Sequence, residues 1–85
     1  AMNNPAPLAV IVPNPARNTI RIETAHPWNG HISILNALGQ EVMRHALHTE
    51  SQQGILNIGH LPAGSYYVHL RNPNQPTTVL PLWIQ

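Results

Sequence analysis

The 85-residue chain has no cysteine, no lysine and no aspartate, and its formal charge of +1 comes from four arginines and three glutamates. Without cysteine, disulfides and thiolate metal sites are excluded, and the redox compartment stays open. Without aspartate, no aspartate can orient a histidine for a serine nucleophile. Because the few charges are of both signs, they form no basic patch, and nucleic-acid binding gains no support.

The chain also lacks long apolar runs. Its longest apolar stretch is far shorter than the roughly 20 residues that cross a bilayer, so no membrane span is expected. The first residues have neither the basic region nor the apolar stretch of a secretory signal. Only 8% of the residues are charged, which is low for a free-standing surface. We therefore expect one domain at 8–85, cut from a larger protein, preceded at 1–7 by a linker end or by residues left from cloning.

What the chain does contain is a succession of short segments, separated by nine prolines and five glycines, in which apolar and polar residues alternate. Alternation with period 2 and a turn about every 8–12 residues is typical of a small antiparallel sandwich. Seven strands are predicted, at residues 8–12, 19–23, 31–34, 41–47, 56–58, 66–71 and 78–84. The predicted fold is all-β, a seven-stranded antiparallel immunoglobulin-like β-sandwich.

The same alternation predicts which side chains enter the core. Ile20 and Ile22 should face inward from the second strand, because residues two apart lie on one face. Val68 and Leu70 should do the same from the sixth strand, and Tyr67 should face outward.

Two turns follow from their residue types. Gly39, within residues 36–40, is expected to supply the positive φ of a short hairpin loop. Pro13 and Pro15 lack an N–H and cannot sit inside a ladder, so they predict a stiff corner between the first two strands. Asn14, between them, is expected to cap this local turn with its side chain.

Tyr66 has a structural explanation. It follows Gly64 by two residues and is preceded by Leu61. This pattern resembles the tyrosine corner of immunoglobulin-like sandwiches, in which the ring is buried and the hydroxyl bonds the backbone. We therefore expect the ring of Tyr66 in the core and its hydroxyl on a nearby carbonyl.

The six histidines and two tryptophans do not predict a ligand site. His45 and His48 are three apart, which places them on opposite faces of a strand. The other histidines stand singly, so we expect solvated surface side chains and no bound metal. Trp28 and Trp83 lack flanking polar clusters and are expected to pack rather than to stack on a sugar.

No catalytic arrangement is predicted either. Ser33, Ser51 and Ser65 lie in no Gly-x-Ser-x-Gly elbow, and the glycines form no phosphate-binding loop. The three glutamates provide no carboxylate pair in an apolar setting. We expect neither an enzyme nor a bound cofactor.

The order of the motifs, however, resembles that of one family. An apolar run enters a Pro-Asn-Pro corner, alternating strands flank a glycine turn, and a Leu-x-x-Gly-x-Tyr motif precedes an apolar last strand. The motif residues are Pro13, Asn14, Pro15, Gly39, Leu61, Gly64 and Tyr66. The series runs from about residue 8 to the end of the chain. It resembles the type A C-terminal sorting domain of the type IX (Por) secretion system of Bacteroidetes.

The resemblance implies a secretion and sorting signal attached to a larger cargo protein. In that family an outer-membrane translocon recognises the domain after Sec export, and a gingipain-like sortase usually removes it and attaches the cargo to the cell surface. The implied partners are therefore the translocon, the sortase and an upstream cargo domain of the same chain. The implied location is the periplasm in transit, and then the cell surface or the extracellular space.

Within this family, we expect the motif residues to serve mainly the fold and the last strand to contact the translocon, through Leu82, Trp83, Ile84 and Gln85. Pro81 removes one donor and confines the strand to a sheet edge. An open apolar edge is a template for β-augmentation by a receptor or for an edge-strand dimer. Deletion of residues 82–85 is expected to abolish secretion and to leave the fold largely intact.

Other functions remain open at this point. The last strand has no basic residue, whereas family members commonly carry lysine there, so an uncleaved sorting domain on a component of the secretion or attachment apparatus is one alternative. A generic immunoglobulin-like or fibronectin-like accessory module of a secreted protein is another. A small carbohydrate- or metal-binding module is the third.

Overall fold

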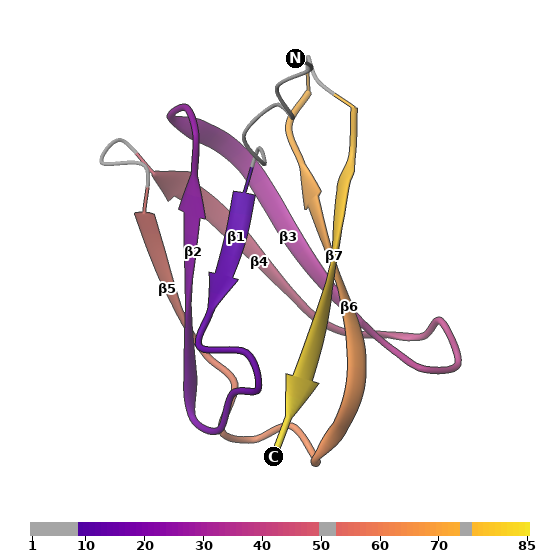
Figure 1. Cartoon of the computed structure of the whole chain (residues 1–85). Helices are drawn as coiled ribbons and strands as arrows, with labels where there is room; N and C mark the ends of the chain where they lie inside the picture. Colours follow the sequence, from indigo (N-terminus) through magenta and orange to yellow (C-terminus); the bar gives the residue numbers. More distant parts are fainter. Residues whose placement is uncertain (1–8, 50–52, 74–75) are drawn as a thin grey trace, which may run out of the picture.

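A computed structural model describes residues 9–49, 53–73 and 76–85 of the chain. The described residues form seven strands and no helix (Figure 1). The strands are β1 (Ala9–Val12), β2 (Thr19–Thr24), β3 (Trp28–Asn36), β4 (Glu41–Thr49), β5 (Gln53–Asn57), β6 (Gly64–Arg71) and β7 (Thr78–Ile84). Residues 1–7 and Leu8, to which the sequence assigned a linker end and the start of the first strand, lie outside this description.

The strands make two sheets. One has three strands in the order β1-β2-β5, and the other has four in the order β4-β3-β6-β7. Every pairing of neighbouring strands is antiparallel. The predicted seven-stranded antiparallel sandwich is therefore confirmed. Two strands begin three residues earlier than predicted. β3 begins at Trp28 because Trp28, Asn29 and Gly30 pair with the end of β4, and β5 begins at Gln53 because its first residues pair with β2.

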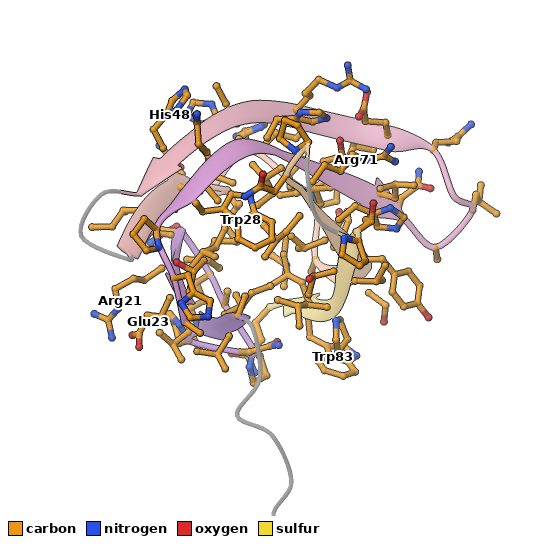
Figure 2. The ribbon with its side chains drawn as sticks, turned by 90° about the horizontal axis from the view of Figure 1, so that it is seen from above. Arg21, Glu23, Trp28, His48, Arg71 and Trp83 are labelled. Carbon is orange, nitrogen blue, oxygen red and sulfur yellow. The ribbon has the colours of Figure 1, made fainter. Side chains whose placement is uncertain are left out.

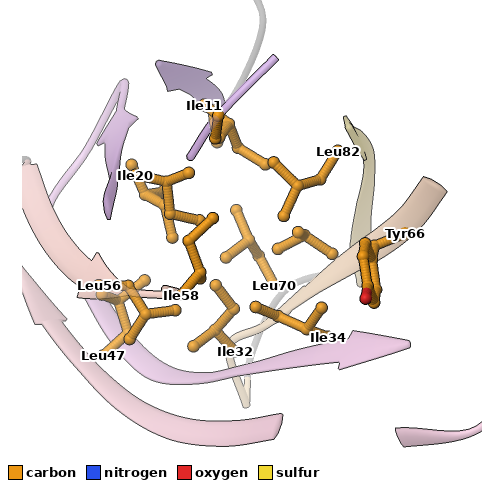
Figure 3. Close-up of a cluster of buried hydrophobic side chains, with 14 of the residues drawn as sticks. Ile11, Ile20, Ile32, Ile34, Leu47, Leu56, Ile58, Tyr66, Leu70 and Leu82 are labelled. Carbon is orange, nitrogen blue, oxygen red and sulfur yellow. The ribbon is translucent and has the colours of Figure 1, made fainter. Parts of the chain in front are cut away.

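The core lies between the two sheets (Figure 3). Alternate residues of both inner faces interdigitate there, as they do in sandwiches generally. The buried apolar side chains are Ala9, Ile11, Ala16, Ile20, Ile22, Trp28, Ile32, Ile34, Leu47, Leu56, Ile58, Tyr66, Val68, Leu70, Leu82 and Ile84. The inward positions predicted from the alternation are among them. Trp28 packs in the core as expected, whereas the expectation that Trp83 packs is wrong, because its side chain is on the solvent face of β7.

One buried residue was not expected. Ser33 is buried although its neighbours Ile32 and Ile34 occupy the inner face of β3. It lies opposite Arg44 on β4 and His69 on β6, in the middle of the four-stranded sheet. Long side chains on the two flanking strands can cover a small residue on a central strand. Alternation predicts only which face a residue occupies, so it cannot predict burial of this kind.

The predicted hairpin between β3 and β4 is confirmed. Gly39 has a φ of +83°, which a residue with a Cβ rarely adopts. The Oδ1 of Asn36 accepts hydrogen bonds from the backbone N–H groups of Leu38 and Gln40, at 3.0 Å each. These side-chain bonds add to two backbone bonds that close the turn, from the Asn36 N–H to the Gln40 carbonyl and from the Gly39 N–H to the Asn36 carbonyl, at 2.9 Å each.

The fold makes a direct prediction about burial. Ile32→Ala removes a fully buried side chain from the centre of β3 and should lower the free energy of unfolding by about 3 kcal/mol. Ile55→Ala truncates a side chain that is 74% exposed and should change it by about 0.5 kcal/mol or less. Urea unfolding of both variants measures the difference. Equal losses would contradict the assignment of the two faces.

Candidate functional site

The last strand, β7, lies at one edge of the four-stranded sheet and pairs with β6 (Figure 1). Its side chains alternate between core and solvent. Leu82 is fully buried and Ile84 is 5% exposed, whereas Trp83, between them, is 49% exposed. Of the four residues predicted to contact a translocon, Trp83 and Gln85 therefore face solvent, and the other two pack into the core.

Trp83 belongs to a small apolar surface on the outside of the four-stranded sheet. Figure 2 shows its indole on the exterior, far from Trp28, which lies between the sheets. Pro81 is opposite Tyr67 of β6, and Val79 and Trp83 flank Pro81 on the same face. All four side chains are exposed. We call Tyr67, Val79, Pro81 and Trp83 the outer patch.

The edge of β7 that faces away from β6 is occupied by the corner before β2. The side chain of Asn14 makes two hydrogen bonds there: its Nδ2 donates to the Pro81 carbonyl at 3.0 Å, and its Oδ1 accepts from the Trp83 N–H at 3.0 Å. Ala16, which is fully buried, continues the contact with its backbone. Its N–H donates to the Trp83 carbonyl at 2.7 Å, and its carbonyl accepts from the Gln85 N–H at 2.8 Å.

These contacts form a short parallel bridge between Ala16 and Ile84. Figure 1 shows the loop after β1 next to the end of β7. The Nε of Arg17 adds a long hydrogen bond of 3.4 Å to the Oε1 of Gln85. We call the segment 14–16, with its three hydrogen bonds to β7 and one to Gln85, the clamp.

The clamp corrects two expectations. The edge of β7 is not open from Pro81 onward, because Pro81 has no N–H and the outward backbone groups of 81–85 are bonded to the clamp. An edge-strand dimer or a receptor strand at this position would first have to displace those bonds. The side chain of Asn14 does not cap its own turn, since both of its hydrogen bonds go to β7, 67 and 69 residues away.

The expected effect of deleting residues 82–85 also changes. The deletion would remove Leu82 and Ile84 from the core together with the groups that the clamp binds. Loss of buried side chains of this size destabilises a small domain strongly. Because Leu82 and Ile84 are buried, we now expect this deletion to destabilise the fold, and single substitutions are needed to separate folding from recognition.

The predicted tyrosine corner is present. Tyr66 is buried, and its hydroxyl donates a hydrogen bond of 2.6 Å to the Pro62 carbonyl (Figure 3). Leu61 packs against the core, and its N–H donates to the Ile58 carbonyl at 3.0 Å. Gly64 has a φ of +153°, so a side chain there would be strained. The Leu-x-x-Gly-x-Tyr motif thus folds the β5–β6 link onto the core.

The motif residues do not form one site. Asn14, between Pro13 and Pro15, is bonded to β7, and the peptide bonds Val12–Pro13 and Asn14–Pro15 are cis. The tyrosine corner lies at the start of β6. Gly39 is in the β3–β4 turn, which extends to the right of the sandwich in Figure 1. Two of the three motifs therefore support the β6–β7 pair. The Pro-Asn-Pro corner bonds to β7, and the tyrosine corner lies at the start of β6.

The charged and histidine side chains of the described residues form two exposed ion pairs and no metal-binding group. Within the described residues, no three histidine or acidic side chains gather as a metal site would require. Arg21 pairs with Glu23 at 2.9 Å on the three-stranded sheet, and Arg44 pairs with Glu41 at 3.1 Å on the other. Both pairs are exposed, so they add little stability.

The carboxyl group of Glu41 lies near Ser33 as well as near Arg44. The hydroxyl of Ser33, and then the guanidinium of Arg44, favour its carboxylate form and lower its pKa from the ordinary value. A separate feature is a shallow, open hollow of about 340 Å³ on the three-stranded sheet, beside Val12, Arg21 and Ile55.

Comparison with known proteins adds one positive finding. A family model described as "Secretion system C-terminal sorting domain" matches residues 10–84, which is nearly the whole chain. No curated protein matches the chain. Among the described residues there is no helix that could cross a membrane. The sandwich and the tyrosine corner are shared with accessory modules of other proteins, whereas the family match is specific.

The tyrosine corner can be tested by removing a single oxygen. Tyr66→Phe leaves the Pro62 carbonyl without its partner and should lower the free energy of unfolding by about 1–2 kcal/mol. Tyr67→Phe, on the exposed neighbour, is the matched control and should change it by less than about 0.5 kcal/mol. Thermal unfolding of the two variants distinguishes them, and an unchanged midpoint for Tyr66→Phe would refute the hydrogen bond.

Proposed function

The chain belongs to the family of secretion system C-terminal sorting domains, and from this membership we propose how its last strand is recognised. The domain is a sorting signal for type IX secretion, so it works with the type IX machinery and with a cargo chain. A sorting signal of this family directs export to the cell surface or the extracellular space, and the role of the family is not a catalytic one. The proposal concerns the route of the domain to the surface and the residues that the secretion machinery contacts on the way.

We propose that the domain passes through the periplasm and that the outer-membrane translocon then contacts it at the exposed side of β7. Trp83 and Gln85 are the contact residues in this proposal, and Leu82 and Ile84 hold the strand in place from the core side. The burial of the latter two supports this division. So does the clamp, because a strand whose outer edge is bonded can offer a receptor its side chains but not its backbone.

The outer patch supports the same site. An exposed tryptophan beside an exposed tyrosine and a proline is an unusual composition for a solvated sheet face. Tryptophan and tyrosine dominate the energetics of protein contacts, because each buries a large rigid surface and loses little conformational entropy. The proposed contact is thus centred on Trp83, with Tyr67 and Pro81 beside it.

After export, a gingipain-like sortase is the proposed processing partner, with this domain as its substrate. A domain that stays attached to a component of the secretion apparatus is the alternative outcome, and the mass of the exported product separates the two. The cargo would then be joined to the cell surface or released.

The proposal predicts an export defect without a folding defect. Residues 3–85 are fused behind a reporter with a Sec signal and expressed in a bacterium that has the type IX system. The wild-type fusion should reach the surface or the medium. Trp83→Ala should reduce the exported fraction about tenfold, since an anchor side chain is worth at least about 1.4 kcal/mol of binding.

Two controls accompany this measurement. Ile55→Ala truncates an apolar side chain on the other sheet that is even more exposed, and its export should equal that of the wild type. Urea unfolding of the isolated domains should show that Trp83→Ala loses at most about 1 kcal/mol. Normal export of Trp83→Ala would refute the contact, whereas retention of the wild-type fusion in the periplasm would refute the sorting function itself.

A further inference from the structure

The clamp joins residues that are distant in the sequence through one exposed side chain. Asn14 is exposed, yet both ends of its carboxamide are bonded to the backbone of β7. The two bonds reach Pro81 and Trp83, which are two residues apart and face the same side of the strand. A neighbouring strand would bond β7 in this way, with one donor and one acceptor.

The carboxamide suits this place for a chemical reason. Pro81 has no N–H, so a full strand partner would find only an acceptor at that position. Asparagine carries one acceptor oxygen and one donor nitrogen on a short stem, and it can therefore satisfy the Pro81 carbonyl and the Trp83 N–H together. Aspartate would offer acceptors only, and leucine would offer neither group.

The prolines on both sides of Asn14 favour the same arrangement. Pro13 and Pro15 fix their own φ angles and have no N–H to donate, so this corner cannot extend β1 as a ladder. Ala16 follows at once, and its backbone bonds to the Trp83 carbonyl and the Gln85 N–H. Both backbone groups of Trp83 are thereby held from the side opposite β6, one by Asn14 and the other by Ala16.

We propose that Asn14 is a positioning residue for the sorting signal. Its carboxamide replaces the strand partner that β7 lacks and sets the position of the Trp83 backbone, so that the indole stands in the outer patch. This inference rests on the proposed contact at Trp83. It adds that export depends on a residue at the other end of the chain, which itself does not touch the translocon.

The test compares two asparagines that make similar bonds. Asn14→Leu removes both bonds to β7. Asn36→Ala removes the two bonds that the Asn36 side chain accepts from backbone N–H groups in the β3–β4 turn, far from the outer patch. Each variant is examined as the reporter fusion for export and as the isolated domain by urea unfolding. The amide resonance of Trp83 in a ¹H–¹⁵N spectrum reports whether the clamp is broken.

We expect Asn14→Leu to shift the Trp83 amide resonance and to reduce export about tenfold, and we expect Asn36→Ala to do neither at a comparable unfolding midpoint. If Asn14→Leu does not fold, Asn14→Asp replaces it. That variant keeps an acceptor for the Trp83 N–H, loses the donor to the Pro81 carbonyl, and should also export less than Asn36→Ala.

Equal export of the Asn14 and Asn36 variants would overturn the inference, because Asn14 would then contribute stability alone. That outcome differs from a failure of the proposed function. In the first case the wild-type fusion is exported and Trp83→Ala is exported about tenfold less. In the second, the wild-type fusion is retained or Trp83→Ala is exported normally.

Discussion

The hydrogen bonds between Asn14 and the backbone of β7 are the interaction on which the proposed recognition surface of this domain depends. They close the outer edge of the last strand where Pro81 has removed a donor, and Ala16 extends them to Gln85. An edge strand without such cover is a template for pairing with other chains. Because the clamp occupies this edge, β7 presents side chains to solvent rather than open backbone groups.

The motif residues and the proposed contact residues therefore have different positions in the fold. Tyr66 bonds the Pro62 carbonyl and sits at the start of β6, and Asn14 binds β7 from the other side. Both support the pair of strands whose outer face carries Trp83 and Tyr67. A small sandwich with only a few charged residues gains most of its stability from the apolar core, to which Leu82 contributes from β7 itself.

Much of this structure could be predicted because it is local. Alternation identified the inner face of β6, glycine chemistry identified the turn at Gly39, and spacing identified the corner at Tyr66. The role of Asn14 could not be predicted, since its partners are more than 60 residues away and a side-chain amide can as well cap its own turn. Because the sequence does not predict these bonds, it also leads to the expectation that the edge of β7 is open. The family resemblance, in contrast, did not need the contacts, because it depended on the order of the motifs.

Amide hydrogen exchange of the wild-type domain tests the clamp most directly. The N–H groups of Trp83 and Gln85 are bonded to the clamp. The N–H of Val79 points to the same edge of β7 but precedes the residues that the clamp binds. If the clamp holds in solution, Trp83 and Gln85 should exchange at least about tenfold more slowly than Val79, after correction for intrinsic rates. Equally fast exchange at all three positions would mean that the edge is open, and the account of the last strand would be wrong.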